Sequence, residues 1–285
     1  MTLEEVLIQA RSNGHAIGHF NISNLEMLRG ILEAAKDSGK APVMIGTSES
    51  EAKFIGRRQA VALITAYRSE GMEVFLNADH HKSVEAAKEA IDAGYDSVHI
   101  DLSKESYEKN LAGTKEVVEY AKAKNPDISV EGELGFLPTD SSKVFSEEIK
   151  INPEDFTKPD QAREFIESTG INRFAPAVGN FHGMSTKMEK KLDFERIKAI
   201  REAMPAEVAL VLHGGSGTSD DQIVQAIKSG MNNVHISTEL RVAYKNALKL
   251  SLQENPDEIA PYKFMKEAVR AVGEVVEGRL RLFNS

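Results

Sequence analysis

The sequence predicts a (β/α)8 barrel with additional helices at both termini. Eight short β-rich segments recur along the 285-residue chain, and helical patterns with apolar residues three or four positions apart separate most of them. Polar residues end nearly every β-rich segment, as expected when the carboxyl ends of parallel strands share one rim. A doubly wound open sheet would instead concentrate such residues at one switch point. We therefore expect residues 1–285 to form a single barrel domain.

The chain is expected to begin with an amphipathic helix, because Thr2 and Glu5 have the spacing of a capping box. Strands are then expected at 15–22, 42–47, 73–79, 97–102, 128–134, 173–178, 207–213 and 233–238. Helices are expected at 24–37, 57–70, 83–93, 106–124, 160–168, 193–203, 219–229 and 239–253. Ser219 and Gln222 have a second capping-box spacing, at the start of a helix.

Three segments interrupt this alternation. Residues 136–159 form a long polar insertion after the fifth strand, and residues 180–192 form a shorter one after the sixth. Long loops on a barrel rim often act as lids, which is the role expected for 136–159. Residues 255–285 form a helical C-terminal extension, which could cover the barrel or mediate contacts in an oligomer.

Composition excludes several classes of protein. The formal net charge is −9, and the acidic residues are spread along the predicted helices, so we expect no nucleic-acid partner. No apolar run is long enough to span a bilayer, and the N-terminus does not have the pattern of a signal peptide. A cytoplasmic protein is the simplest expectation. The chain has no cysteine, so a metal ion would need nitrogen and oxygen ligands.

Three histidines far apart in the sequence stand where apolar segments end, and they suggest a metal site. They are His80 in NADHH, His182 in VGNFHG and His213 in VLHGGSG. Glu133 ends another such segment, in VEGELG. Three imidazoles and a carboxylate form a ligand set that zinc (Zn²⁺) favours, although another divalent metal is possible.

A glycine-rich turn after the seventh strand is a candidate phosphate site. Gly214, Gly215, Ser216 and Gly217 stand between this strand and the next helix, where backbone N–H groups can approach an anion closely. Barrels often bind phosphate after strands seven and eight. The alternative is a turn that only connects the strand to the helix.

The other histidines are assigned from strand alternation. His81 should point away from His80, which favours a surface role or an indirect one over metal coordination. His99 and His235 should point into the barrel. His15 and His19 are expected to be structural.

Six motifs in this order resemble the class II, metal-dependent fructose-bisphosphate aldolases and the related tagatose-bisphosphate aldolases. The motifs are NADHH, HIDLS, VEGELG, VGNFHGM, LHGGSG and STEL, and the similarity runs from about Phe20 to Leu240. GGSG alone is a weak signal. Six ordered motifs, each at the end of a predicted strand, are a specific one.

The resemblance implies roles for the residues around the metal. His80, His182 and His213 would bind zinc, with Glu133 as a ligand or near neighbour. Asp101 and Glu131 match the positions of an alternative metal location. Cleavage between C3 and C4 of a ketose leaves negative charge on C3, which a Lewis acid on the C2 carbonyl spreads into an enediolate.

Asp79 matches the family residue that takes the C4 hydroxyl proton, and in the synthetic direction it would return that proton. The alternative is that Asp79 only orients the imidazole of His80 through a hydrogen bond.

The resemblance also implies how substrate is held. The residues expected around the C1 phosphate are Gly183, Gly214, Ser216, Ser237 and Thr238. Asn21 and Ser48 match substrate-contacting positions, and His235 stands where the family usually has a substrate-contacting asparagine. A monovalent cation could bind nearby, and a homodimer or homotetramer is expected.

Two departures from the family pattern concern the substrate. The family usually carries a Gly-Gly-x-Glu-Asp loop after ELG, whose glutamate moves the C3 proton of dihydroxyacetone phosphate, but this chain has FLPTDSSKVFSEE, with Ser141 at the glutamate position. We expect Asp140, Glu147 or Glu148 to replace it. The family often has an arginine for the distal phosphate, where PYKF here supplies Lys263 as a possible point charge.

Three functions agree with these patterns. The first is reversible cleavage of a ketose 1,6-bisphosphate, with fructose 1,6-bisphosphate preferred, to dihydroxyacetone phosphate and glyceraldehyde 3-phosphate through a zinc-stabilised enediolate. The second is the same reaction on tagatose 1,6-bisphosphate or another phosphorylated ketose. The third is a non-catalytic protein that binds sugar phosphates. A metal-dependent hydrolase is a weaker alternative, because HAIGHFN lacks the usual His-x-His spacing.

Overall fold

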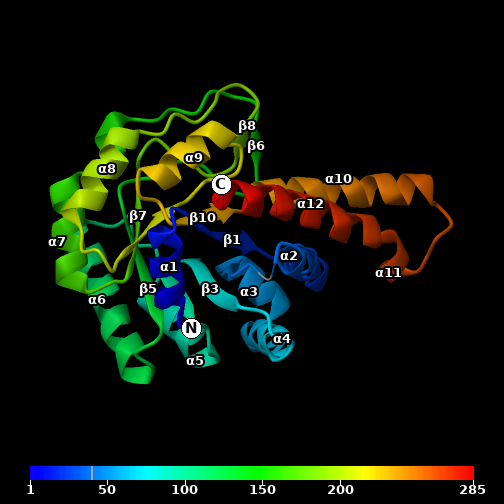
Figure 1. Ribbon diagram of the computed structural model, residues 1–285, viewed down its shortest axis with the longest axis horizontal. Helices are drawn as coiled ribbons and strands as arrows, with labels where there is room; N and C mark the ends of the chain where they lie inside the picture. The colour runs from blue at the N-terminus through cyan, green and yellow to red at the C-terminus, as the bar shows by residue number, and fades with distance from the viewer. Residues whose placement is uncertain (40) are drawn as a thin grey trace.

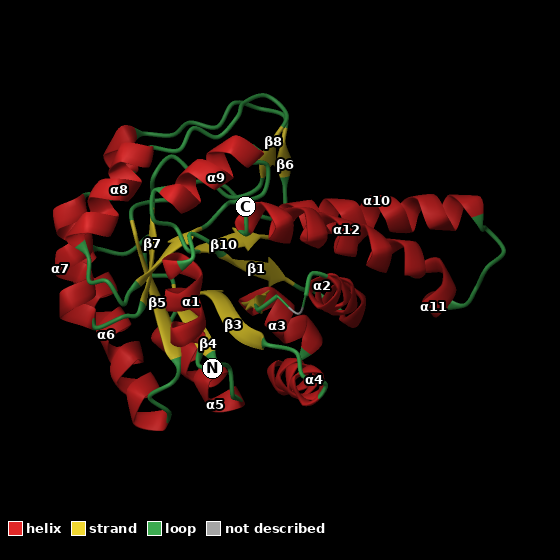
Figure 2. Ribbon diagram, in the orientation of Figure 1, coloured by secondary structure: helices red, strands yellow, loops and turns green. Residues whose placement is uncertain are grey.

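The computed structural model describes residues 1–39 and 41–285, and within them eight parallel strands close into a barrel (Figures 1 and 2). The order around the barrel is β1-β10-β9-β7-β5-β4-β3-β2. The strands are β1 (Ile17–Asn21), β2 (Val43–Ser48), β3 (Val74–His81), β4 (Ser97–Ile100), β5 (Ser129–Leu134), β7 (Arg173–Pro176), β9 (Ala209–Leu212) and β10 (Asn233–Ile236). The predicted (β/α)8 barrel is therefore confirmed, and the doubly wound sheet is excluded.

Helices surround this barrel because their apolar faces pack on the outward side chains of the strands in one continuous core. They are α2 (Leu25–Asp37), α4 (Arg57–Ser69), α5 (Val84–Ala93), α6 (Tyr107–Lys124), α7 (Pro159–Thr169), α8 (Phe194–Ala203), α9 (Asp220–Lys228) and α10 (Thr238–Glu254). A short helix that the sequence did not predict, α3 (Glu49–Ile55), precedes α4. Gly56, whose φ is 91°, separates α3 from α4.

The N-terminal helix α1 (Leu3–Ser12) closes the amino end of the barrel. Its capping box is formed as predicted, with Thr2 and Glu5 each binding the other's backbone N–H. The buried face of α1 packs against side chains from β1, β2, β3 and β9, in a cluster of Leu3, Val6, Leu7, Ala10, Ile17, Met44, Phe75 and Ala209. The opposite, carboxyl rim is the end where polar residues gather.

The two predicted insertions meet over the carboxyl rim. The first contains the short strand β6 (Val144–Phe145) and the 3₁₀ turn η1 (Pro153–Asp155), and the second contains β8 (Met184–Ser185). β6 and β8 pair in parallel as a separate two-stranded sheet, visible beside α9 in Figure 2. The pairing joins the loop that follows β5 to the loop that carries His182.

The C-terminal extension forms an arm. α10 and α12 (Lys266–Phe283) run side by side away from the barrel, with α11 (Pro261–Phe264) near the far end (Figure 1). Val272, Val276 and Phe283 of α12 are buried in the main core. The predicted helical extension therefore begins at residue 261, because 255–260 form the turn between α10 and α11.

The capping box predicted at Ser219 is wrong, since the side chain of Ser219 does not cap α9. The amide of Gln222 instead holds the second insertion, accepting from the Leu192 N–H and donating to the Lys190 carbonyl.

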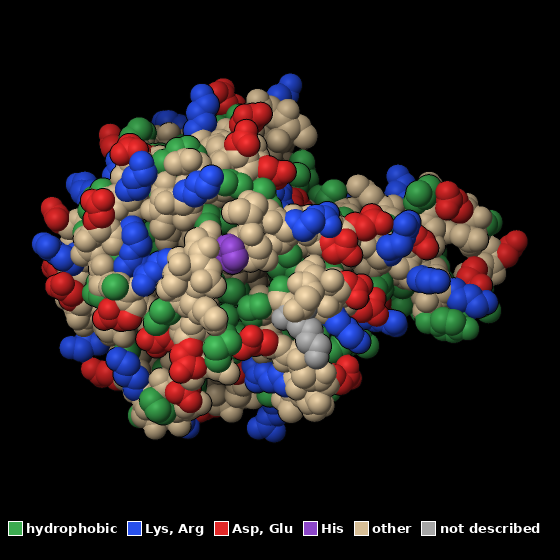
Figure 3. Space-filling view, in the orientation of Figure 1, with side chains coloured by type: hydrophobic (Ala, Val, Ile, Leu, Met, Phe, Trp, Pro, Cys, Tyr) green, Lys and Arg blue, Asp and Glu red, His purple; other side chains and the backbone are tan. Residues whose placement is uncertain are grey.

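On the surface, acidic and basic side chains are interspersed over the face in Figure 3, without a basic patch of the kind that binds nucleic acid. None of the helices in the described part of the chain is both long enough and apolar enough to cross a membrane.

Candidate metal centre at the carboxyl rim

A bulge near the end of β3 places Asp79 and His80 at the same site. In a regular strand, neighbouring residues point to opposite faces. The pairing of β3 with β4 changes register between Ala78 and His81, and His80 adopts a φ of 48°. This left-handed conformation is uncommon outside glycine and is typical of functional positions.

Three histidine rings converge at this rim. Nε2 of His80 lies 3.0 Å from Nδ1 of His213 and 3.1 Å from Nε2 of His182. With metal–nitrogen bonds of 2.0–2.1 Å, two imidazole nitrogens on one tetrahedral zinc ion would lie about 3.3 Å apart. His80 and His213, together with Asp79 and His99, offer ligand atoms that all lie within 4.8 Å of one another, so they are placed to share a divalent cation. His182 approaches His80, but its ring centroid lies 5.9 Å from that of His213, and it belongs to no such group among the described residues.

Two carboxylates orient these rings from behind. Nδ1 of His80 lies 2.9 Å from Oδ2 of Asp101, and Nε2 of His213 lies 2.6 Å from Oε1 of Glu131. Because an ionised carboxylate only accepts hydrogen bonds, each imidazole carries its proton on that side. A cation that displaces the proton between His80 Nε2 and His213 Nδ1 would then meet the lone pairs of both atoms.

Glu133 supplies a buried oxygen without a partner. Its Oε2 forms no hydrogen bond among the described residues, and it lies 3.9 Å from Nδ1 of His80 and 3.5 Å from Nε2 of His99. Burial, with the nearby charge of Asp101, raises the pKa of Glu133 well above its usual value. An unpaired buried carboxyl beside histidines suits the neighbourhood of a cation.

The electrostatic field at His80 favours positive charge. Burial alone would lower the pKa of His80, but the charges of Asp79, Asp101 and Glu133 and the hydrogen bond to Asp101 raise it to about 10. The same negative field would attract a metal ion, which competes with protons for imidazole nitrogens.

Asp79 is a buried carboxylate beside this centre. Its Oδ2 accepts a 2.9 Å hydrogen bond from Nδ2 of Asn21, and its Oδ1 lies 3.5 Å from Nδ1 of His235. Burial raises the pKa of Asp79, but the charge of His80 and the contact with His235 outweigh burial and hold it well below its usual value. Asp79 is therefore ionised and can accept a proton.

Of the remaining histidines, His15 is half-buried and the other four are buried. His99 and His235 lie inside the barrel, as alternation predicts, and the His99 ring centroid is 4.5 Å from that of His80. His81 is fully buried, so the surface alternative is wrong and the indirect role stays a prediction. His19 stacks on His235 with ring centroids 3.6 Å apart, which sequence analysis did not predict.

A small pocket adjoins the three histidines. It is lined by Asn21, Asp79, His80, Ser141, His182, Gly183, His213, Gly214, Ser216, His235, Ser237 and Thr238. The tight turn in its wall depends on Gly214, because φ is 65° there and a β-carbon would lie 2.2 Å from the carbonyl oxygen of Phe181. The Oγ of Ser216 accepts the N–H of Ser237, which links the walls contributed after β9 and β10.

Ser141 closes this pocket from the first insertion. Its carbonyl accepts a 2.7 Å hydrogen bond from Oγ1 of Thr238, and its hydroxyl accepts a 3.2 Å bond from Nη1 of Arg241. The remaining volume is about 30 Å³, roughly the share of one water molecule in the liquid. Ser141 and the first insertion therefore occupy the space beside the histidines.

Several residues named from the sequence lie elsewhere. Ser48 does not line the pocket, because its side chain caps α3 in a capping box with Glu51. Gly215 packs its backbone against β10, donating to the carbonyl of His235. Lys263 lies in α11 on the arm and pairs with Glu258, so it does not reach the pocket of its own chain (Figure 1).

The three loop carboxylates differ in their distance along the chain from the pocket. Asp140 is adjacent to Ser141, and its Oδ1 accepts a 2.8 Å hydrogen bond from the Ser142 N–H. That bond lowers the pKa of Asp140 below its usual value. Glu147 and Glu148 are exposed and do not line the pocket.

Four charged residues at or below the rim were not predicted. Glu51 is buried, binds Asn21, and pairs with Arg241 at 2.6 Å. Arg173 is buried inside the barrel and pairs with Glu131, and Lys190 is buried behind the pocket. None is part of a recognisable motif, so only the folded chain reveals them.

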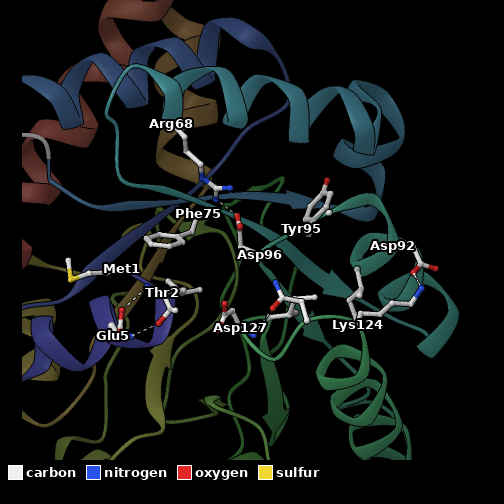
Figure 4. Close-up of a pocket in the computed structure, with 15 residues that line it drawn as sticks. Met1, Thr2, Glu5, Arg68, Phe75, Asp92, Tyr95, Asp96, Lys124 and Asp127 are labelled. Atoms are coloured by element: carbon white, nitrogen blue, oxygen red, sulfur yellow. Dashed lines mark hydrogen bonds and ion pairs between the residues drawn. The ribbon is translucent and has the colours of Figure 1, made fainter.

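A larger, open pocket of about 780 Å³ lies near the amino end of the barrel beside α1 (Figure 4). Four of its charged side chains form two ion pairs, Arg68 with Asp96 and Lys124 with Asp92, and Glu5 and Asp127 also line it. No histidine lines it.

The fold and its rim define a (β/α)8-barrel protein with histidine and carboxylate groups that could hold a metal ion. The family model for class-II fructose-bisphosphate aldolase matches residues 1–285, and the chain belongs to this family. It is therefore an enzyme of a lyase family that is metal-dependent and acts on phosphorylated sugars.

Individual relatives agree with this assignment. The chain is 36% identical over 289 residues to fructose-bisphosphate aldolases of Staphylococcus aureus (strain Mu50 / ATCC 700699) and Geobacillus stearothermophilus, covering 100% of this chain and 97% of each relative. Among solved structures, the YdjI aldolase from Escherichia coli K12 is similar with a TM-score of 0.82, 32% identity and coverage of 99% and 96%. A putative fructose-1,6-biphosphate aldolase from Coccidioides immitis is similar with a TM-score of 0.83, 28% identity and the same coverage.

Proposed function

We propose that this enzyme reversibly cleaves fructose 1,6-bisphosphate to dihydroxyacetone phosphate and glyceraldehyde 3-phosphate, and that it uses zinc. The observation that carries the proposal is the convergence of His80, His182 and His213 beside the ionised carboxylate of Asp79. The names of the S. aureus and G. stearothermophilus relatives support the choice of substrate.

In this proposal the three imidazoles hold the cation, with Glu133 close by. A bound divalent cation would polarise the C2 carbonyl and stabilise the negative charge left on C3. Asp101 and Glu131 act on the imidazoles, fixing the ring nitrogen that carries the proton. The nitrogen-rich donor set favours zinc over magnesium or calcium, which prefer oxygen ligands.

Asp79 accepts the proton of the C4 hydroxyl as the C3–C4 bond breaks. Its low pKa keeps the group in the carboxylate form, and the amide of Asn21 fixes its orientation. In the direction of synthesis, Asp79 returns the proton to the C4 oxygen.

The C1 phosphate occupies the pocket formed by Gly183, Gly214, Ser216, Ser237 and Thr238. Two of these residues, Gly183 and Gly214, have positive φ, which lets the backbone approach an anion closely. The phosphate enters when Ser141 leaves, and the hydroxyl of Thr238 then becomes free to donate to it.

Asp140 moves the proton at C3 of dihydroxyacetone phosphate. It is the loop carboxylate that adjoins Ser141, whereas Glu147 and Glu148 lie beyond β6. Opening and closing of the insertion would bring its carboxylate over the rim.

Tagatose 1,6-bisphosphate is the second candidate substrate. His235, which lies 3.5 Å from Asp79, would contact the substrate near C4, where the two ketoses differ in configuration. A side chain with a different shape at this position can change which epimer fits.

The enzyme is also proposed to be a homo-oligomer that uses the arm. Ile259 and Tyr262 at the tip of the arm are 88% and 76% exposed, which favours a contact with another copy. Lys263, beside Tyr262, could meet a substrate phosphate only in such a neighbouring copy.

Zinc-loaded enzyme should be assayed with fructose and tagatose 1,6-bisphosphates side by side, with and without a chelator. We expect faster cleavage of the fructose compound, loss of turnover on chelation, and no lysine adduct after borohydride treatment with substrate. Faster cleavage of the tagatose compound would make tagatose 1,6-bisphosphate the preferred substrate. Turnover that survives chelation, or a trapped adduct, would reject the metal mechanism.

A further inference from the structure

Lys190 lies behind the phosphate pocket with its side chain enclosed. Its Nζ donates hydrogen bonds of 2.9, 2.5 and 2.6 Å to the carbonyl oxygens of Gly183, Gly214 and Ser216. An ammonium has three N–H donors, so each donor meets one carbonyl. Within residues 1–39 and 41–285, Lys190 forms no salt bridge with a carboxylate, and its relative exposure is 1%.

The three carbonyls belong to two segments that carry histidines of the metal centre. Gly183 follows His182, and Gly214 and Ser216 follow His213. Lys190 therefore connects the segment after β7 with the segment after β9. Its backbone is fixed in turn, because the Lys190 carbonyl accepts a 2.6 Å hydrogen bond from Nε2 of Gln222 in α9.

An ammonium in this position is costly to bury. Burial lowers the pKa of Lys190 to about 7, and the charge of Glu239 opposes that shift. The Phe181 ring, 4.5 Å from Nζ, offers a favourable cation–π contact in addition to the three carbonyls. A neutral amine has only two N–H donors, so the three carbonyl contacts favour the charged form.

Without a cation, three carbonyl dipoles would place partial negative charge behind the wall of an anion pocket. All three carbonyls belong to residues that line that pocket. A positive charge at their centre cancels this repulsion and adds attraction for an anion in front of them. Lys190 thus stands where a small monovalent cation could also be coordinated by the same oxygens.

We propose that Lys190 is a built-in monovalent cation, which organises the phosphate pocket and makes a dissociable potassium or sodium ion unnecessary. Lys190 is a positioning residue, since it acts through the backbone of Gly183, Gly214 and Ser216. The proposal rests on the proposed function for the identity of the anion, a sugar phosphate, while the pocket's need for a cation can be measured with inorganic phosphate alone.

The test compares Lys190→Ala with wild type and with Lys191→Ala, a matched change at the neighbouring exposed lysine. The dissociation constant of inorganic phosphate is measured by calorimetry in tetramethylammonium chloride, and potassium or ammonium is then added at constant ionic strength. The KM and kcat for fructose 1,6-bisphosphate are measured in the same buffers.

Wild type and Lys191→Ala should bind phosphate equally well with or without potassium. Lys190→Ala should bind phosphate at least about tenfold more weakly in tetramethylammonium, because charge-assisted hydrogen bonds behind the pocket are lost. Ammonium or potassium should restore most of that affinity by entering the space left by the side chain. KM should rise more than kcat falls.

Unchanged phosphate affinity of Lys190→Ala in tetramethylammonium would overturn the proposal, and so would a loss that neither cation restores. If Lys190→Ala does not fold, the effect of potassium on wild type tests the proposal instead. Clear activation of wild type by potassium would contradict a built-in cation, and no activation would support one. If wild type cleaves neither bisphosphate but the phosphate results hold, the proposed function fails while the role of Lys190 stands.

Discussion

Oε1 of Glu131 accepts a 2.6 Å hydrogen bond from Nε2 of His213, while Oε2 of Glu131 lies 2.8 Å from Nη1 of Arg173. All three side chains are buried inside the barrel. Burial raises the pKa of Glu131, but His99, Arg173 and His213 outweigh burial and hold it well below its usual value. Arg173 therefore keeps Glu131 ionised, and Glu131 keeps Nδ1 of His213 free for a cation.

Replacing Glu131 by glutamine should weaken zinc binding by about 10- to 100-fold, because the neutral amide no longer fixes the proton on His213. Competition with a chromophoric chelator measures the zinc dissociation constant. Glu207→Gln, at an exposed position, is the matched control and should bind zinc like wild type. Wild-type affinity in Glu131→Gln would show that His213 needs no such partner.

Asp79→Asn should lower kcat by about 10²- to 10⁴-fold, because the amide cannot take the C4 hydroxyl proton. Zinc content, measured by mass spectrometry, should stay near wild type, since Asp79 is not expected to be a ligand. Asp127→Asn, exposed at the amino end of the barrel, controls for the loss of one carboxylate. If zinc is lost together with activity, Asp79 serves the metal site and not proton transfer.

The loop carboxylates can be separated by following solvent proton exchange into dihydroxyacetone phosphate. Asp140→Asn should slow exchange, whereas Glu147→Gln and Glu148→Gln should not, because only Asp140 adjoins the residue that closes the pocket. NMR in deuterated buffer measures the rate. Slowed exchange in a glutamate variant would assign transfer of the C3 proton to that glutamate. Unchanged exchange in all three variants would show that no carboxylate of the insertion transfers this proton.

Gly214→Ala should destabilise the protein by about 1–3 kcal/mol or more, because the residue has a φ of 65° and a β-carbon would lie 2.2 Å from the Phe181 carbonyl oxygen. Gly278→Ala, within α12, meets no atom within 4 Å and should stabilise the protein by about 0.5–1 kcal/mol. Urea unfolding measures both. A Gly214 variant as stable as wild type would mean that the turn can relax around a side chain.

The sequence predicted the barrel because strand and helix patterns are local. The spacing of apolar residues in segments such as 97–102 depends only on the segment itself and on which face it buries. The same argument placed His182 and His213 at the rim, since each follows an apolar run. Ser219 was misjudged, because a capping spacing does not decide where Gln222 bonds. The position of Lys263 on the arm could not be predicted, because a motif near the C-terminus does not decide where the arm points.

The sequence by itself determined the order of strands and helices, the rim at which polar residues gather, and the family to which the chain is similar. Only the tertiary structure decided the bulge that turns His80 beside Asp79, the pairing of Glu131 with Arg173, and the contact of Lys190 with three carbonyls. Glu131 and His213 are 82 positions apart, and Lys190 and Ser216 are 26 apart. Such contacts depend on how the closed barrel brings distant segments together, whereas periodicity records only which side of one segment is buried.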